Sequence, residues 1–256
     1  MSLSRLILVF AFVIGASKAL TQEDIVLSMS HDQVSITTNF NGSQIIIFGA
    51  VKREIAIPDN PLHVLVTVSG PKQPVQVRRK AKKFGIWINT DTVEVDEAPS
   101  FYAVATTGPW SDTISDIEDL RYKISIPRAI RSVGAPQTVS DSQNFTDALI
   151  RINKNNGLYA LLPNSVTLKD STLFHTAIDL PANLVEGDYE TRVFLTRDQK
   201  VISEYNTMID VRKVGLERFL YNLSRQTPLI YALLSLVVAG FCGWAASAIF
   251  QIIRAR

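Results

Sequence analysis

"QVSITTNFNGSQIIIFGAV", residues 33–51, carries the pattern that decides the fold: two runs rich in β-branched residues on either side of Asn41-Gly42. Such runs are typical of β-strands, and Asn-Gly is a strong turn signal. Similar runs continue to residue 107, separated by turn residues: HVLVTVSG, VQVRR, FGIWIN, TVEV and SFYAVATT. About seven short strands in about 85 residues predict an immunoglobulin-like antiparallel sandwich over residues 20–110.

In the next segment, residues 111–157, the apolar residues recur at helical spacing and no longer alternate. Its first half predicts a helix from Asp112 to Ser125, with Ser115 and Glu118 as a capping box and Pro127 as its end. The apolar face of that helix would consist of Ile114, Ile117, Leu120 and Ile124. A helical insert therefore interrupts the strands.

A second short helix is expected at residues 144–157, where Gly157 follows the last apolar position. Its apolar face would consist of Phe145, Leu149 and Ile152. Strand patterns return over residues 158–213 and predict a second, smaller sandwich. The expected fold is thus mainly β, with two immunoglobulin-like antiparallel sandwiches, a short helical insert and one C-terminal transmembrane helix.

The two ends of the chain indicate export and anchoring. Arg5 precedes about ten apolar residues, too few to span a bilayer of about 30 Å. They suit a signal peptide, residues 1–19, with cleavage after Ala19. From Pro228 no charge occurs until Arg254, and about 25 helical residues cover about 37 Å. Residues 228–253 are therefore expected to span a membrane.

The segment before this span, residues 214–227, has Leu216, Phe219, Leu220 and Leu223 on one helical face. Such an amphipathic helix either lies in the headgroup layer or packs under the second sandwich. With a cleaved signal and a terminal span, residues 20–227 would lie outside the cytoplasm and residues 254–256 inside.

Charge and cysteine content narrow the class of protein. Without the four basic residues at the two ends, 22 of the 26 basic residues remain against 24 acidic ones, a net charge of −2. A nucleic-acid binder would carry a clearly basic domain. The only cysteine, Cys242, lies in the predicted span. An exported domain without disulfides favours a bacterial periplasm, and hence a single-pass protein of the inner membrane.

No catalytic motif occurs in the sequence. His31, His63 and His175 are scattered and lack metal-ligand spacing. Two acidic clusters, residues 91–97 and 112–119, do not follow a calcium-loop pattern and are expected to be solvated faces. We expect no enzyme activity, no metal and no cofactor.

Five basic residues lie close together between two apolar stretches: Arg78, Arg79, Lys80, Lys82 and Lys83. This pattern predicts the charged, solvated turn of a hairpin, which is favoured over a site for an anion or a lipid headgroup. Trp87 lies in the same hairpin. It either covers the sheet against the helix over residues 112–125 or is exposed for a partner, and we favour the first.

The predicted span contains a stripe of small side chains spaced every four residues: Ser235, Ala239, Gly243 and Ser247. In lipid, small residues let two helices approach closely. The stripe favours a helix-packing face for a second copy or a multi-pass transporter over a simple anchor.

Several blocks of the chain, among them GPKQPVQVRRKAKKFGIWIN, ALIRINKNNGLY and KVGLERFLY before the final span, resemble a family of alphaproteobacterial putative transmembrane proteins of unknown function. The resemblance covers nearly the whole chain. It implies an inner-membrane protein with a periplasmic domain, and a sulfite-exporter-type permease as partner. It supplies no site residues.

The expected function is that of a membrane-anchored periplasmic interaction or accessory protein. The alternative is a periplasmic receptor for a small anionic ligand that uses residues 78–83. A small-molecule receptor would show ligand-dependent stabilisation, whereas an interaction protein would co-purify with a membrane protein.

Overall fold

The computed structural model describes residues 23–254 apart from 32, 37–39, 55, 135–138, 140 and 214–215, and not the side chains of 213, 216–219, 222 and 248–254. The fold is mainly β, as predicted, with several antiparallel pairings and one long apolar helix at the C-terminal end. The predicted signal peptide, residues 1–19, lies outside the described residues.

Four strands form the first sheet, in the order β1-β3-β10-β9, with antiparallel neighbours throughout. Their bounds are Asp24–Met29 (β1), Ser43–Lys52 (β3), Thr167–Lys169 (β9) and Leu173–Leu180 (β10). Buried and exposed residues alternate strictly along β10. One face of this sheet is therefore covered and the other faces solvent, as antiparallel sheets allow.

Six strands form the second sheet, in the order β2-β12-β11-β4-β7-β8. Their bounds are Gln33–Ile36 (β2), Leu62–Ser69 (β4), Tyr102–Thr106 (β7), Tyr159–Leu162 (β8), Gly187–Arg197 (β11) and Lys200–Lys213 (β12). The two outer pairings, β2 with β12 and β7 with β8, are parallel. The central strands β4 and β7 are almost entirely buried, so this sheet is covered on both faces.

One hydrophobic core lies between the two sheets and contains side chains from both the early and the late strands. It includes Ile45, Ile47, Phe174 and Ile178 from the first sheet and Val64, Val66, Tyr189 and Val193 from the second. The strands expected in two sandwiches, residues 20–110 and 158–213, are thus interleaved, because β3 pairs with β10 and β4 with β11. Alternation specifies which face of a strand is buried, but not which strand lies beside it.

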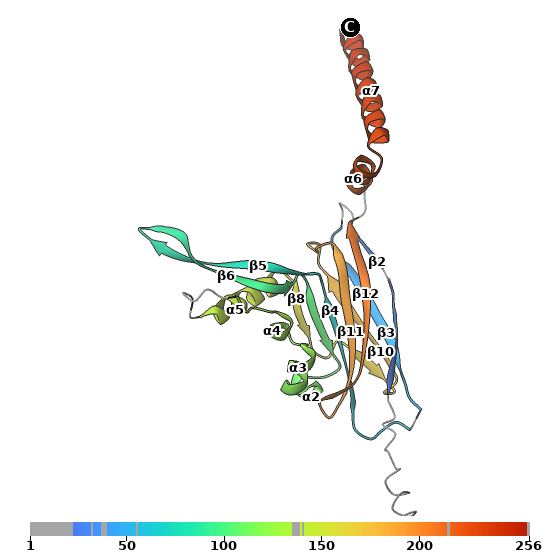
Figure 1. Cartoon of the computed structure of the whole chain (residues 1–256). Coiled ribbons are helices and arrows are strands. Elements are labelled where there is room, and N and C mark those ends of the chain that lie inside the picture. Colours follow the sequence, from blue (N-terminus) through green and yellow to red (C-terminus); the bar gives the residue numbers. More distant parts are fainter. Residues whose placement is uncertain are drawn as a thin grey trace, which may run out of the picture.

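The helical insert forms a third layer on the outer face of the six-stranded sheet (Figure 1). Its helices are Trp110–Thr113 (α2), Asp116–Tyr122 (α3), Ile126–Ala129 (α4) and Ser142–Asn155 (α5). A second core lies beneath them and includes Leu65, Tyr102 and Phe194 of the sheet and Ile124, Ile126 and Leu149 of the insert.

The single helix expected over residues 112–125 is wrong. Ile114 has extended backbone between α2 and α3, and α3 ends at Lys123, which has a left-handed φ of 53°. Ser115 does cap α3, since its hydroxyl accepts a hydrogen bond from the Glu118 amide at 3.4 Å. Pro127 does not end a helix. It lies in the first turn of α4, where a backbone N–H would have no partner within the helix, so its absence from proline costs no hydrogen bond.

Only part of the expected apolar faces is buried. Ile114 and Ile124 are buried, whereas Ile117 and Leu120 are exposed. In α5, Phe145 and Leu149 are buried as predicted, and Ile152 is about half exposed at 49%. The helix follows a turn at Asp141 and is followed by Gly157 at φ 71°, a conformation that glycine adopts readily.

A long hairpin of two strands projects from the body: Lys72–Lys83 (β5) and Ile86–Pro99 (β6). It forms a separate two-stranded sheet, and α5 lies against its inner half (Figure 1). We call residues 78–91 the finger and residues 80–89 the finger tip. The finger leaves the body at the end from which the last two helices rise.

Those last helices are Leu216–Gln226 (α6) and Pro228–Arg254 (α7). Within α7, residues Pro228–Ser247 are long and apolar enough to cross a membrane, with a mean hydropathy of 2.0, and the rest of the described chain buries none of that window. This agrees with the predicted span. Helix α6 coincides with the predicted amphipathic segment, residues 214–227.

Candidate functional site

The turn of the hairpin consists of Phe84 and Gly85. Lys83 pairs with Ile86, so two residues make the loop, and both have positive φ, 51° and 86°. The predicted hairpin is confirmed, but the basic run does not form its turn, because those residues belong to strand β5. A two-residue loop with positive φ at both positions favours Asn-Gly, and Phe84 is an unfavourable residue for it.

Strand alternation divides the basic residues between the two faces of the hairpin. Lys82 lies opposite Trp87 and Lys80 opposite Asn89 on one face, while Lys83 lies opposite Ile86 on the other. The register shifts between Arg79 and Lys80, which marks a β-bulge. The five basic side chains therefore do not converge on one point.

Arg79 is the basic residue that holds the finger to the body. Its guanidinium lies 2.5 Å from a carboxylate oxygen of Asp141, 3.8 Å from one of Asp91, and 4.5 Å from the ring centre of Phe145. Hydrogen bonds from Asn144 and from Arg79 hold the pKa of Asp141 below its ordinary value. The inner end of the finger is thus fastened to α5.

The other basic residues are left to solvent. Arg78 donates to the side-chain oxygen of Gln76, on its own strand, at 3.0 Å. The side chains of Lys80, Lys82 and Lys83 form no hydrogen bond or ion pair with the described part of the chain.

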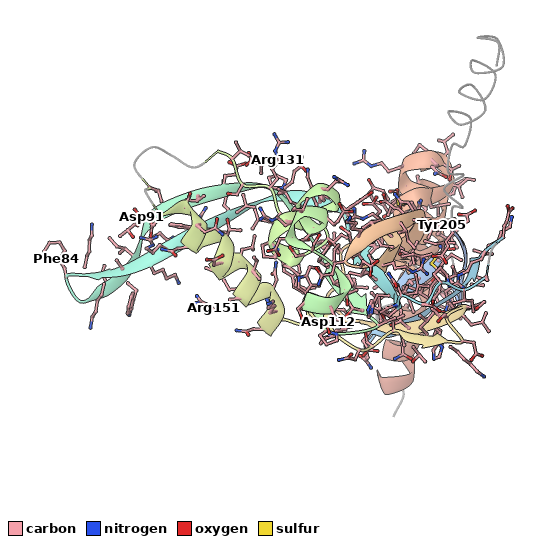
Figure 2. The ribbon with its side chains drawn as sticks, turned by 90° about the horizontal axis from the view of Figure 1, so that it is seen from below. Phe84, Asp91, Asp112, Arg131, Arg151 and Tyr205 are labelled. Atoms are coloured by element: carbon pink, nitrogen blue, oxygen red, sulfur yellow. The ribbon has the colours of Figure 1, made fainter. Side chains whose placement is uncertain are left out.

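Apolar side chains of the finger tip are exposed beside these lysines. Phe84 is fully exposed at the far end of the molecule (Figure 2), and Ile86 and Trp87 are 64% and 68% exposed. The expectation that Trp87 covers the sheet is wrong, since the insert packs on β4, β7 and β11 and Trp87 lies next to the turn, away from that core. The exposed apolar tip was missed in the sequence; the Phe-Gly pair between strand patterns was its one signal.

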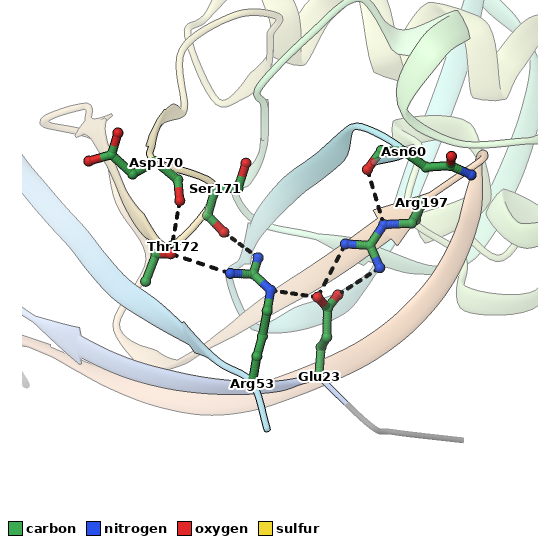
Figure 3. Close-up of polar contacts among 7 residues, drawn as sticks. All are labelled: Glu23, Arg53, Asn60, Asp170, Ser171, Thr172 and Arg197. Atoms are coloured by element: carbon green, nitrogen blue, oxygen red, sulfur yellow. Dashed lines mark hydrogen bonds and ion pairs between the residues drawn. The ribbon is translucent and has the colours of Figure 1, made fainter. Parts of the chain in front are cut away.

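A buried charge cluster lies in the body (Figure 3). Glu23, which is 4% exposed, accepts a hydrogen bond from Arg53 at 2.6 Å and forms an ion pair with Arg197 at 3.1 Å. Arg53 also donates to Thr172 and to the carbonyl of Ser171. The cluster joins the start of β1, the segment after β3 and the end of β11, and so has a structural role.

The three histidines lie on separate segments: the loop after β1, strand β4 and strand β10. His31 and His63 each lie near one hydroxyl, of Ser30 and Thr107, at 3.0 and 3.2 Å. His175 is exposed on β10. Among the described residues there is no group of three or more His, Cys, Asp or Glu that could hold a metal ion.

Carboxylates of the two acidic clusters accept hydrogen bonds from backbone amides, and Glu118 and Asp119 are buried, not solvated as expected. Hydrogen bonds from the amides of Val133 and Gly134 hold the pKa of Asp96 below its ordinary value. Asp119 accepts from two amides after α3, and Glu118 accepts from the amide of Val201. Glu118 thus fastens the insert to β12 and Asp96 fastens it to β6, whereas Asp119 fixes the turn after α3.

The small side chains of α7 are exposed along one face: Ser235, Ala239, Gly243 and Ser247. Apart from the neighbouring residues and backbone of α7 itself, no atom of the described residues comes within 4 Å of a β-carbon placed on Gly243. The Ser235 hydroxyl donates to the Tyr231 carbonyl at 2.8 Å and so needs no other partner within lipid. This face is free for another helix.

Comparison with known proteins identifies the family. No curated protein sequence matches this one. A family model described as "Putative transmembrane protein (Alph_Pro_TM)" matches residues 24–252, which include both sheets, the insert, the finger and nearly all of α7. The chain therefore belongs to the Alph_Pro_TM family of transmembrane proteins.

Proposed function

We propose that this protein is a membrane-anchored interaction protein of the bacterial inner membrane, with its β-domain in the periplasm and the finger as its contact surface. The observation that carries this proposal is the exposed apolar end of the finger. Phe84 has a left-handed backbone that a phenylalanine disfavours, and its ring touches nothing in the described body. Clustered exposed apolar groups on a rigid projection favour a binding surface.

The periplasmic placement is supported by the two ends of the chain. A signal-like N-terminus and a C-terminal span favour export of the domain between them. The single cysteine, Cys242, lies in α7, and a body of this size buries two cores without a disulfide.

The finger can be tested in native membranes with a photoreactive phenylalanine at position 84. We expect crosslinks to a membrane component, either a protein or a lipid, because the described part of the chain does not pack against the ring at this position. The matched control is the same amino acid at Phe48, which is 43% exposed on the outer face of β3. Mass spectrometry of the adducts is the measurement; position 84 reacting no more than position 48 would contradict the proposed function.

A membrane protein is the proposed partner for α7, either a multi-pass transporter, for which the family resemblance suggests the sulfite-exporter type, or a second copy. Helices associate in lipid where small residues allow close approach. The described part of the chain leaves the small-residue face of α7 uncovered.

Gly243→Ile should abolish this association, because a bulky side chain would hold the two helix backbones apart. The measurement is crosslinking through Cys242, together with co-purification of membrane proteins in mild detergent. Val238→Ile, on the opposite side of α7, is the matched control and should leave both unchanged. Equal association of all three proteins would show that α7 is only an anchor.

A further inference from the structure

The finger tip combines the side chains that favour a membrane interface. Phe84, Ile86 and Trp87 are largely exposed, and Ile88 is 38% exposed. Aromatic rings with a polar atom, such as the indole of tryptophan, are enriched where lipid tails meet headgroups. These residues lie within five consecutive positions that include the turn.

Positive charge surrounds this apolar end. Residues 78–90 contain five basic residues and no acidic residue. Arg79 forms an ion pair with Asp141, whereas the side chains of Lys80, Lys82 and Lys83 form no ion pair with the described chain. Basic residues next to exposed apolar groups are typical of segments that bind anionic bilayers.

The arrangement of these groups favours lipid over a protein surface. Lys82 with Trp87 lies on one face of the hairpin, and Lys83 with Ile86 on the other. A flat protein partner would contact one face and leave the second exposed. A headgroup layer that the tip enters surrounds both faces at once, with the apolar turn innermost and the lysines at the phosphates.

The finger projects sideways from the body, across the direction of α7 (Figure 1), so the body has to tilt relative to α7 for the tip to reach the bilayer that holds α7. The finger leaves the body at the end from which α6 and α7 rise (Figure 1), and β5 spans about 40 Å at about 3.4 Å per residue. The salt link of Arg79 to α5 fixes its inner end. The tip is therefore carried sideways, clear of the body.

We propose that the finger tip inserts into the anionic headgroup layer of the bilayer in which α7 is anchored, so that the domain has two membrane attachments. This inference rests on the proposed function, since it names the surface that the finger contacts. The apolar turn enters the interface, and the three free lysines bind lipid phosphates.

The test uses the full chain with Trp87 as its sole tryptophan, through Trp110→Phe and Trp244→Phe. The protein is reconstituted in phosphatidylcholine vesicles with or without phosphatidylglycerol. Brominated phosphatidylcholine quenches an indole that enters the bilayer. We expect a blue-shifted and quenched Trp87 emission in the anionic vesicles, and a weaker effect in high salt because salt screens the lysine–phosphate attraction.

Two variants examine the charge and the apolar turn separately. Neutralising three lysines should lower the partition constant of the tip about five-fold each, or about a hundred-fold together; the variant is Lys80→Gln, Lys82→Gln, Lys83→Gln. Its matched control neutralises three exposed lysines of the body: Lys52→Gln, Lys169→Gln, Lys200→Gln. Phe84→Asn should also remove the quenching while leaving the melting temperature unchanged or raised, because asparagine suits a left-handed turn position.

Unquenched Trp87 in anionic vesicles would overturn the membrane inference. If position 84 then still crosslinks to a protein in native membranes, the finger contacts a protein and the proposed function stands. If position 84 crosslinks to neither protein nor lipid, both proposals fail.

Discussion

Replacing Glu23 by alanine should lower the free energy of unfolding by about 3–5 kcal/mol, because it leaves two arginines without their buried counter-charge. Glu23, Arg53 and Arg197 are 4%, 6% and 14% exposed as side chains, so solvent cannot replace the lost carboxylate. The cluster also joins three segments far apart in the sequence (Figure 3). Denaturant titration of the full chain in detergent, followed by circular dichroism, is the measurement.

The control is Glu94→Gln, which changes an exposed carboxylate on β6 and should alter stability by less than about 0.5 kcal/mol. An equally small loss for Glu23→Ala would show that the buried cluster does not stabilise the fold.

The same cluster gives the stability a defined dependence on pH. Burial raises the pKa of Glu23, but hydrogen bonds and charges from Arg53 and Arg197 outweigh it and hold the pKa below its ordinary value of 4.5. The folded state thus binds this proton more weakly than the unfolded state. The stabilisation is present above pH 4.5 and is lost as the pH falls through the folded-state pKa.

Acidification from about pH 5 to about pH 3 should therefore destabilise the wild type more than Glu23→Gln, which has no proton to gain at this position. The pKa values of Asp96 and Asp141 are also lowered, and these groups titrate in both proteins. The difference between the two proteins isolates Glu23; parallel curves would contradict its role.

Phe194→Ala should cost about 3–5 kcal/mol, as expected for truncation of a fully buried aromatic side chain. Phe194 of β11 lies opposite Leu65 of β4, and its ring packs edge-on against Tyr122 of α3 at 5.6 Å. The substitution thus weakens contacts among the late strands, the early strands and the insert.

Because one pair of sheets is shared by both ends of the chain, unfolding of the β-domain should occur in a single transition that Phe194→Ala shifts as a whole. Two transitions, of which only one shifts, would instead support two separate sandwiches. Phe48→Ala removes an exposed phenylalanine of β3 and should change stability by less than about 1 kcal/mol.

Sequence patterns correctly predicted the features that depend only on residues close together in the chain. The turn residues and alternating runs identified most strands, because a strand with one buried and one solvent-exposed face has an apolar residue at every second position. Phe145 and Leu149 marked the buried face of α5 through their spacing. The uncharged run after Pro228 identified α7, since its length and composition alone match a bilayer.

Pairing and exposure required the tertiary structure. The strands of residues 20–110 satisfy the same alternation whether they pair with each other or with β10 and β11, so the sequence could not distinguish two sandwiches from one interleaved pair of sheets. Ile117 and Trp87 are apolar and were expected to be covered, yet they are exposed because no element of the described chain packs on them. The periodicity of apolar residues predicts which face of its strand or helix a residue occupies, but not which element packs against that face.

A β-rich domain with one apolar C-terminal helix could be predicted from the order of residues, because hydrophobic periodicity and uninterrupted apolar length are properties of contiguous residues. The meeting of Glu23 with Arg53 and Arg197, and the place of the basic run in a strand beside an exposed apolar turn, became visible only in the folded chain. Those features depend on which distant segments are neighbours and on where the body ends, and neither is encoded in any single stretch of residues.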